Sequence, residues 1–285
     1  MKKVAAINDL SGAGRCSLMA AIPVLSVMGL QVYPLPTAVL SNQTGYPEFY
    51  MEDFTPHMGH FTRMWEKLGF SFDGIYTGFL AEVSQVEEIE RFLEVFCKKD
   101  TFLLVDPIMG DDGARYPNFD DDLCDAIGRL TKKATLLTPN LTECCFLTGA
   151  DYEALVAKKH SPQYLEDIAA LGQQLLSETT KQVVITGIRY QGEGETEEWF
   201  YNLLLEGDQW SVVKTTAHGG SFSGTGDLLA SVLCGGILRG MSLLDAVSLA
   251  TELITSSIAD TIKAPYDRND GIVFEPHLSL LLPKE

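Results

Sequence analysis

The sequence predicts an α/β fold in which a mostly parallel central sheet carries helices on both faces. Short runs rich in β-branched residues alternate along the 285 residues with amphipathic segments of helical periodicity. This alternation is typical of right-handed βαβ crossovers, which place helices against a parallel sheet. Polar, glycine-rich segments follow the strands, as expected where ligands bind beyond the carboxyl ends of parallel strands. With 46% hydrophobic residues and no Pro/Gly/Ser-rich linker, residues 1–285 are predicted to form one domain.

The elements of this α/β alternation are short and follow one another closely. The strands are predicted, from their β-branched and apolar runs, near Val4–Asn8, Gln31–Val39, Phe72–Thr77, Phe102–Asp106, Thr135–Thr138 and Val183–Thr186. The helices between them are predicted, from their periodicity, at Cys16–Met28, Met58–Leu68, Ser84–Lys98, Asp121–Lys132, Leu141–Leu147 and Pro162–Ser177. The last helix has a specific start signal, because Ser161 can cap it and Pro162 takes the first helical position.

The pattern changes after Gly187. Two alternating runs, Glu198–Leu205 and Trp210–Thr215, are joined by Glu206-Gly207-Asp208-Gln209 and predict a small antiparallel hairpin. Two helices near Thr225–Arg239 and Leu243–Lys263 follow the hairpin.

Composition excludes several classes of partner. The net charge of −18 argues against nucleic acid and against an anionic membrane surface, both of which attract basic proteins. No apolar run approaches 18 residues, and the apolar run after Met1-Lys2-Lys3 is too short for a signal peptide. The six cysteines lack Cys-x-x-Cys spacing and are expected to be reduced, structural thiols. We therefore expect a cytoplasmic protein.

A glycine-rich turn precedes the first of the two final helices. It runs from Gly219 to Gly226 and ends at Asp227, the single carboxylate before an apolar helical run. Backbone amides of such a turn, together with the helix N-terminus, favour binding of a phosphate. Asp227 would there accept a proton from a hydroxyl group attacking that phosphate, although an Asp in a first turn is also a common helix cap. The pattern favours ATP-dependent phosphorylation of an alcohol.

Carboxylates also follow two of the predicted strands. Asp106 and Asp111 flank a Pro and a Gly, and Glu143 closes the segment Thr138-Pro139-Asn140-Leu141-Thr142-Glu143. Hard oxygen ligands in loops suit Mg²⁺, which bridges nucleotide phosphates. A dinucleotide fingerprint is not complete, because Ser17 stands where a third glycine should follow Gly12-Ala13-Gly14, and no P-loop motif is present.

These segments, in this order, resemble the pyridoxal kinase group of the ribokinase-like superfamily over nearly the whole chain. The run Ser41-Asn42-Gln43-Thr44-Gly45-Tyr46 is similar to the Ser-Asn-x-Thr-x-Tyr stretch of that group. The resemblance implies a ribokinase-like fold and transfer of the γ-phosphoryl group of ATP to the hydroxymethyl group of a B6 vitamer, which is pyridoxal, pyridoxamine or pyridoxine. It also implies Mg²⁺, a homodimer and, as a further candidate, a monovalent cation.

The resemblance assigns roles to individual residues. Asp227 becomes the catalytic base, and the amides of Gly224, Thr225 and Gly226 become the anion hole. Thr44 contacts the pyridoxal ring, and Phe79 lies beside the ring pocket. The nucleotide side comprises Asn140, Glu143, Thr186 and Gly226 for ATP, and Asp106, Asp111 and Glu143 for Mg²⁺. The loop Asp112–Pro117, with Gly113 as a hinge, corresponds to a flap over ATP.

One segment departs from the pyridoxal kinase pattern. Pyridoxal kinases commonly begin with a strand that ends in a Ser-His pair, whereas here the first strand runs into Asn8-Asp9-Leu10-Ser11-Gly12-Ala13-Gly14. This sequence is more similar to the Asp-x-Ser-Gly-x-Ala-Gly opening of hydroxymethylpyrimidine kinases of thiamine biosynthesis or salvage. A hydroxymethylpyrimidine kinase is therefore the alternative to a pyridoxal kinase. Asp9 and Ser11 are both candidates for contacting a ring nitrogen or hydroxyl. A sugar kinase and an idle nucleotide-binding protein are more distant alternatives.

Overall fold

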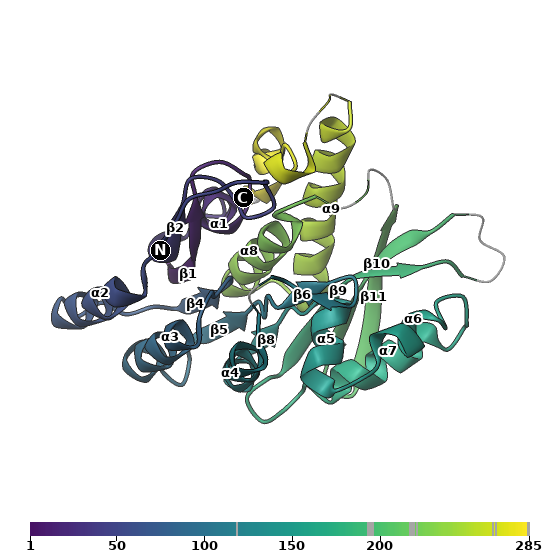
Figure 1. Cartoon of the computed structure of the whole chain (residues 1–285), viewed down its shortest axis with the longest axis horizontal. Coiled ribbons are helices and arrows are strands. Elements are labelled where there is room, and N and C mark those ends of the chain that lie inside the picture. The colour runs from purple at the N-terminus through teal and green to yellow at the C-terminus, as the bar shows by residue number, and fades with distance from the viewer. Residues whose placement is uncertain are drawn as a thin grey trace. The chain divides into compact units, whose positions relative to one another are not determined.

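The computed structural model describes residues 1–117, 119–192, 197–216, 220, 222–263, 265 and 267–283. They form two compact units, the first comprising residues 1–104 and 219–285 and the second residues 105–218 (Figure 1). The predicted α/β fold with a mostly parallel sheet and helices on both faces is confirmed. The single domain stays a prediction. Gly219 and Ser221 of the predicted phosphate turn lie outside the described residues.

The first unit is built around β1, whose middle residues are fully buried. Its strands are β1 (Lys3–Ser11), β2 (Gln31–Leu40), β3 (Met51–Asp53), β4 (Gly74–Thr77) and β5 (Phe102–Val105), in the order β5-β4-β1-β2-β3. β1 pairs in parallel with β2 and β4. Residues 4–7 have no exposed surface, which explains their continuous apolar character. β3, an antiparallel edge strand of three residues, was not predicted.

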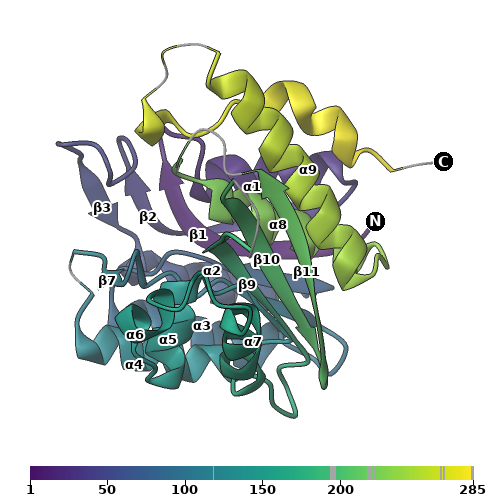
Figure 2. The ribbon, with the colours of Figure 1, turned by 90° about the vertical axis from the view of Figure 1, so that its right-hand side faces the viewer.

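Helices of the first unit form two groups. The helices are α1 (Ser17–Val27), α2 (Thr55–Lys67), α3 (Val83–Phe96), α8 (Thr225–Leu238) and α9 (Leu243–Thr261). α8 is buried along nearly its whole length and packs against α1 and α9, and Figures 1 and 2 show α8 and α9 side by side. α2 and α3 pack on each other. The buried course of α8 fixes the position of its first turn, which carries Asp227.

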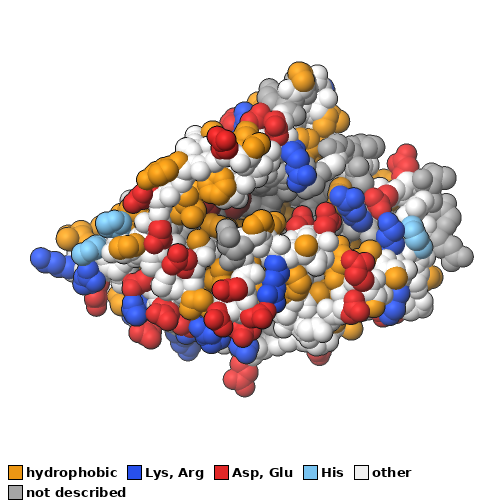
Figure 3. Space-filling model, viewed as in Figure 1, with side chains coloured by type: hydrophobic (Ala, Val, Ile, Leu, Met, Phe, Trp, Pro, Cys, Tyr) orange, Lys and Arg blue, Asp and Glu red, His pale blue; other side chains and the backbone are white. Residues whose placement is uncertain are grey.

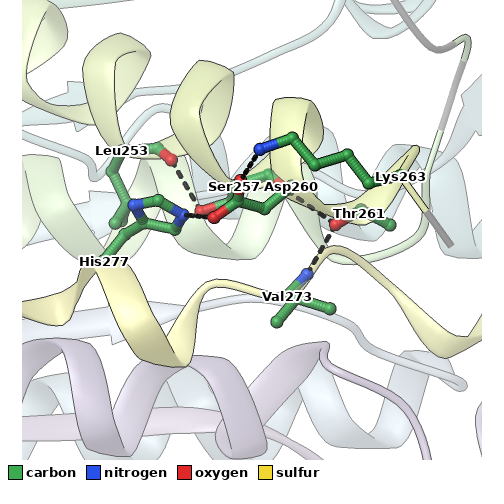
Figure 4. Close-up of polar contacts among 7 residues, drawn as sticks. All are labelled: Leu253, Ser257, Asp260, Thr261, Lys263, Val273 and His277. Carbon is green, nitrogen blue, oxygen red and sulfur yellow. Dashed lines mark hydrogen bonds and ion pairs between the residues drawn. The ribbon is translucent and has the colours of Figure 1, made fainter.

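The C-terminal segment is attached to α9 by polar contacts. It contains two short 3₁₀ helices, η1 (Arg268–Asp270) and η2 (Glu275–Leu281). His277 Nε2 lies 2.8 Å from Asp260 Oδ2, and the Val273 N–H donates to Thr261 Oγ1 over 2.8 Å (Figure 4). Thr261 in turn donates to the Ser257 carbonyl oxygen at 2.7 Å. The chain is thereby fastened to α9 on the C-terminal side of η1.

The second unit contains the predicted hairpin. Its sheet strands are β8 (Leu136–Leu137), β9 (Gln182–Tyr190), β10 (Trp199–Glu206) and β11 (Gln209–Thr216), in the order β11-β10-β9-β8. β8 and β9 are parallel, whereas β10 is antiparallel to both of its neighbours. The hairpin turn consists of Gly207 and Asp208, and Gly207 has φ +57°. A positive φ at this turn position suits glycine.

A smaller hairpin lies where a loop was predicted. β6 (Gly110–Asp111) and β7 (Ala114–Arg115) pair antiparallel around Asp112 and Gly113, which have φ +48° and +80°. Positive φ at both central residues is the signature of a tight type I′ connection. A Cβ on Gly113 would lie 2.5 Å from the Tyr152 ring, so the position needs glycine for space as well.

The helices of the second unit are α4 (Asp121–Thr131), α5 (Leu141–Thr148), α6 (Tyr152–Val156) and α7 (Tyr164–Gln173). The predicted start at Pro162 is wrong, because α7 begins at Tyr164 after an uncapped Gln163. Ser161 instead accepts from the Gln163 N–H at 3.3 Å, so Ser161 and Pro162 belong to the preceding turn. α6 was missed because its five residues are too few to show a period, although Asp151 caps it by accepting from the Ala154 N–H.

The surface carries charges of both signs. On the face shown in Figure 3, acidic and basic side chains are interspersed among polar and apolar ones. None of the helices in the described ranges combines the length and apolar character needed to cross a bilayer.

Candidate active site

Asp227 lies in the first turn of α8 with only 8% of its surface exposed. Its Oδ1 accepts from Asn8 Nδ2 at 3.0 Å and from the Tyr76 hydroxyl at 3.4 Å, and the Ser17 backbone N–H also hydrogen-bonds to this carboxylate. Burial raises the pKa of Asp227 to about 6, while these donors stabilise the charged form. A carboxylate with a pKa near neutrality is suited to accept a proton from an alcohol.

The turn before Asp227 has the geometry of an anion-binding loop. Gly224, the N-cap of α8, has φ +81°, and a Cβ there would collide with the Arg15 carbonyl oxygen, so only glycine fits. At Gly226 a Cβ would meet no atom of the described residues within 4 Å. The described residues therefore leave space beside the first turn, and the N–H groups of a helix N-terminus favour an anion there. The Thr225 hydroxyl donates to the Phe222 carbonyl at 3.2 Å and braces the turn.

Asp9 and Ser11, the two candidate ring contacts at the end of β1, hydrogen-bond to each other. Ser11 Oγ donates to Asp9 Oδ2 at 2.9 Å, and both side chains are buried. Burial raises the pKa of Asp9, and hydrogen bonds from Ser17 and Ser11 oppose that shift. Ser17 therefore hydrogen-bonds to both carboxylates. Its hydroxyl bonds to Asp9, and its backbone N–H donates to Asp227. Ser17 has φ +51°, an uncommon conformation for a residue with a side chain.

The loop that carries Thr44 is held beside the turn of α8 by Gln43. Gln43 Nε2 donates to Ser223 Oγ at 3.3 Å and to the Asn269 carbonyl oxygen at 3.1 Å. Its Oε1 accepts from the Gly45 N–H at 2.7 Å. The Tyr46 hydroxyl hydrogen-bonds to Asp270 in η1. Thr44 itself is exposed on this braced loop.

Phe79 follows β4 and is half-buried. Its N–H donates to Asn8 Oδ1 at 2.8 Å, and its carbonyl oxygen accepts from Thr37 Oγ1 at 3.1 Å. Asn8 thus connects the Phe79 backbone to the Asp227 carboxylate. The first unit therefore brings Asp227, the described part of its glycine turn, the Asp9–Ser11 pair and Phe79 together around the ends of β1 and β4.

In the second unit, Asn140 and Glu143 form a reciprocal capping box at the start of α5. Asn140 Oδ1 accepts from the Glu143 N–H at 2.9 Å, and Glu143 Oε2 accepts from the Asn140 N–H at 2.8 Å. Glu143 Oε1 accepts from the Met109 N–H at 3.0 Å, and Asn140 Nδ2 donates to the Gly110 carbonyl at 2.8 Å. Thr186 on β9 forms an isolated parallel bridge with Asn140. The sequence motif therefore joins α5, β9 and the β6 hairpin.

Glu143 of this capping box is repelled by the neighbouring carboxylate of Asp106. Burial and the neighbouring charge of Asp106 raise the pKa of Glu143 well above its usual range. Asp106 is 7% exposed and accepts from Thr138 Oγ1 at 2.8 Å, whereas Asp111 is exposed. Across the part of the chain that the structure describes, no three His, Cys, Asp or Glu side chains form a metal cage. Mg²⁺ commonly uses one or two carboxylates with waters and phosphates, and Asp106 with Glu143 fits that requirement.

Four site residues were not identified from the sequence: Asn8, Ser17, Gln43 and Tyr76. Asn8 and Gln43 lie inside the motifs that were recognised, so their place beside Asp9 and Thr44 was an available signal. Ser17 was noted only because it breaks a dinucleotide fingerprint. Tyr76 carried no signal, because a tyrosine in a strand of this kind is ordinarily a core residue.

Known proteins that are similar in sequence or structure match nearly the whole chain. The family profile described as phosphomethylpyrimidine kinase matches residues 13–270. A "putative phosphomethylpyrimidine kinase" from Bacteroides thetaiotaomicron, crystallised with pyridoxal, is 36% identical, with 98% of this chain and 95% of that chain covered and a TM-score of 0.85. Pyridoxal kinase from Lactobacillus plantarum is 27% identical over 99% of this chain and 96% of that chain, with a TM-score of 0.84. The pyridoxal kinase of Dictyostelium discoideum is 23% identical over 95% of this chain and 88% of its own length.

Proposed function

Because the chain belongs to the phosphomethylpyrimidine kinase family, we propose that it transfers the γ-phosphoryl group of ATP to the hydroxymethyl group of a B6 vitamer. The product is the 5′-phosphate of pyridoxal, pyridoxamine or pyridoxine. One observation carries the proposal: a buried carboxylate, Asp227, lies at the N-terminus of a buried helix directly after a glycine turn with open space beside it.

The chemistry assigned to the first unit is proton transfer and charge stabilisation. Asp227 takes the proton as the hydroxymethyl oxygen attacks the γ-phosphorus, and the ADP oxygen leaves. The amides of Gly224, Thr225, Gly226 and Asp227 stabilise negative charge on the transferring group. Burial keeps the Asp227 carboxylate a stronger base than an exposed aspartate, since its pKa is about 6.

The second unit is assigned the nucleotide and its metal. Asn140 and Thr186 are the proposed ATP contacts of this unit. Asp106 and Glu143 would hold Mg²⁺, which would neutralise charge on the nucleotide phosphates. Asp111, predicted as a third ligand, is exposed, and it forms no group of three metal-ligating side chains with them in the described part of the chain. Support for a cation comes from the buried like-charge pair. Burial and the charge of Asp106 raise the pKa of Glu143, and a cation beside both carboxylates would relieve their repulsion.

A hydroxymethylpyrimidine kinase is the alternative, and the Asp9–Ser11 pair favours it. These two residues belong to the opening segment that is similar to hydroxymethylpyrimidine kinases, and the matching family carries a phosphomethylpyrimidine kinase description. The B6 vitamer is preferred for two reasons. The stretch Ser41–Tyr46, which is similar to that of pyridoxal kinases, includes Thr44 on a loop braced by Gln43, and the Bacteroides relative was crystallised with pyridoxal.

A homodimer is also proposed. Its support is a set of exposed apolar side chains on β2, β3 and the connection between them, namely Val39, Phe49, Tyr50 and Met51. Isolated exposed apolar residues are common, but a group along a sheet edge favours association. Light scattering on the wild-type chain and on Tyr50→Asp would test it, and a wild-type monomer at micromolar concentration would contradict it.

A panel of acceptor alcohols tests the reaction. ATP consumption and product mass would be measured with pyridoxal, pyridoxamine, pyridoxine, hydroxymethylpyrimidine and a hexose, with Asp227→Asn as the control for contaminating kinases. We expect the highest kcat/KM for a B6 vitamer. A tenfold preference for hydroxymethylpyrimidine would overturn the B6 assignment, and turnover of none of these alcohols would overturn the kinase assignment.

A further inference from the structure

The side chain of Asn8 is fully buried, and every described contact of its amide has a defined direction. Oδ1 accepts from two backbone N–H groups, that of Asp9 at 3.0 Å and that of Phe79 at 2.8 Å. Because both partners are donors, the oxygen must face them, and the amide nitrogen faces Asp227. Nδ2 then donates to Asp227 Oδ1 at 3.0 Å. The amide orientation is therefore fixed by the backbone and not by the carboxylate.

Gly78 provides the space that this amide occupies. A Cβ at Gly78 would collide with Asn8 Nδ2 and would lie 2.6 Å from Asn8 Cγ and 2.9 Å from Asn8 Oδ1. Gly78 is not among the glycines with positive φ, so its backbone conformation is open to alanine. Glycine is therefore needed at position 78 to leave space for the Asn8 side chain and not for its backbone conformation.

Groups from each neighbouring element face the Asp227 carboxylate. Asp9 comes from β1, the Cys16 thiol and the Ser17 N–H come from the start of α1, and the Tyr76 hydroxyl comes from β4. Burial and the charges of Asp227 and Asp9 raise the pKa of Cys16 to about 12, so that thiol stays neutral. Asn8 is the nearer of the two side-chain donors, at 3.0 Å against 3.4 Å for Tyr76.

We propose that Asn8 is a positioning residue that holds the Asp227 carboxylate in its proton-accepting orientation and ties it to the Gly78–Phe79 backbone beside the ring pocket. This inference rests on the proposed function for its catalytic consequence. A small misplacement of a reacting group can cost about 10²-fold in rate. Loss of a hydrogen bond to the ionised form also disfavours that form, so the carboxylate should hold its proton to higher pH.

Three variants separate this role from a purely structural one. Asn8→Asp keeps an acceptor oxygen for the Asp9 and Phe79 N–H groups but replaces the donor that faces Asp227. Asn8→Ala removes both functions. Gly78→Ala leaves Asn8 in the sequence but displaces its amide. Gly128→Ala in α4 is the matched control, because among the described residues a Cβ there meets only Leu147, at an ordinary 3.8 Å.

The readout is kcat as a function of pH at saturating ATP and alcohol. We expect the acid limb of the profile to move to higher pH by about one unit or more in the three test variants, with kcat lowered about tenfold at the pH optimum and the KM for ATP retained. The control should match wild type. If Asn8→Asp and Gly78→Ala are folded, as judged by circular dichroism, and keep the wild-type acid limb, Asn8 has only a structural role.

A second measurement separates this inference from the proposed function. The carboxyl carbon of Asp227 would be titrated by ¹³C NMR in the substrate-free protein, with its resonance identified by its loss in Asp227→Asn. An upward shift of its midpoint in Asn8→Asp and Gly78→Ala supports the role of Asn8 even if none of the tested alcohols is phosphorylated. Coincident titrations in wild type and both variants would reject that role even for an active kinase.

Discussion

Asp227 should make the stability of this protein depend on pH in a measurable way. Its pKa is raised from 3.8 to about 6 in the folded state because the carboxylate is buried. The folded state therefore holds a proton on Asp227 more tightly than the unfolded state does. This group contributes stability that is fully present below pH 3.8 and is lost as pH rises through about 6.

The magnitude follows from the size of the shift. A displacement of about two pKa units corresponds to about 3 kcal/mol in the free energy of unfolding, at about 1.4 kcal/mol per unit. About 2 kcal/mol of this lies between about pH 7.5 and about pH 4.5. Asp227→Asn lacks the titration. Its amide also changes the hydrogen bonds with Asn8, Ser17 and Tyr76, but that cost is the same at every pH.

The assay is urea unfolding of wild type and Asp227→Asn across this pH range. We expect the wild-type protein to gain about 2 kcal/mol relative to Asp227→Asn as pH falls from about 7.5 to about 4.5. Taking the difference between the two proteins cancels the titration of all other groups that the substitution leaves unchanged. A difference that stays constant within about 0.5 kcal/mol would refute the reasoning, because it would show that Asp227 titrates like an exposed aspartate.

Three further outcomes concern activity. Asp227→Asn should lower kcat by about 10²–10⁴ while ATP binding, measured by calorimetry, is largely retained; a variant keeping more than about a third of kcat would make Asp227 a helix cap only. Activity should require Mg²⁺, and Glu143→Gln should raise the Mg²⁺ concentration for half-maximal rate more than the KM for the alcohol; the reverse pattern would place Glu143 in the alcohol pocket. Thr44→Val, which removes a hydroxyl at similar volume, should lower kcat/KM for B6 vitamers several-fold, corresponding to a lost hydrogen bond of about 1 kcal/mol; an unchanged kcat/KM would remove Thr44 from the ring contacts.

Local patterns were sufficient for much of the fold. Alternation of apolar runs identified β1, β2, β4, β5 and β9, and the predicted hairpin is β10 with β11. The failures have local causes as well. Ser161-Pro162 carries a valid helix start signal, but Ser161 bonds to Gln163 in a turn and the helix begins later. The β6–β7 hairpin has two residues in each strand, too few to show an alternating period.

The candidate site was predictable where the proposed functional residues are contiguous in the sequence. The glycine turn and Asp227 are contiguous in sequence, and the structure places Gly224 to Asp227 at the start of α8. The environment of Asp227 was not predictable in this way. Asn8 is 219 positions from Asp227 and Tyr76 is 151 positions away, and only the pairing of β1 with β4 and the packing of α8 bring them together. Without these contacts, the pKa of Asp227 could not be argued from the sequence.

The pKa of Asp227 results from two opposed sets of contacts. Burial and the charge of Asp9 raise it, and the Ser17 N–H, the Asn8 amide and the Tyr76 hydroxyl lower it. With more exposure, the carboxylate would return toward a pKa of 3.8 and become a weaker base. With fewer donors, its pKa would rise further and the carboxyl would stay protonated to higher pH. The fold therefore holds Asp227 at a cost in stability near neutral pH, and the same burial that causes this cost makes the carboxylate an effective base.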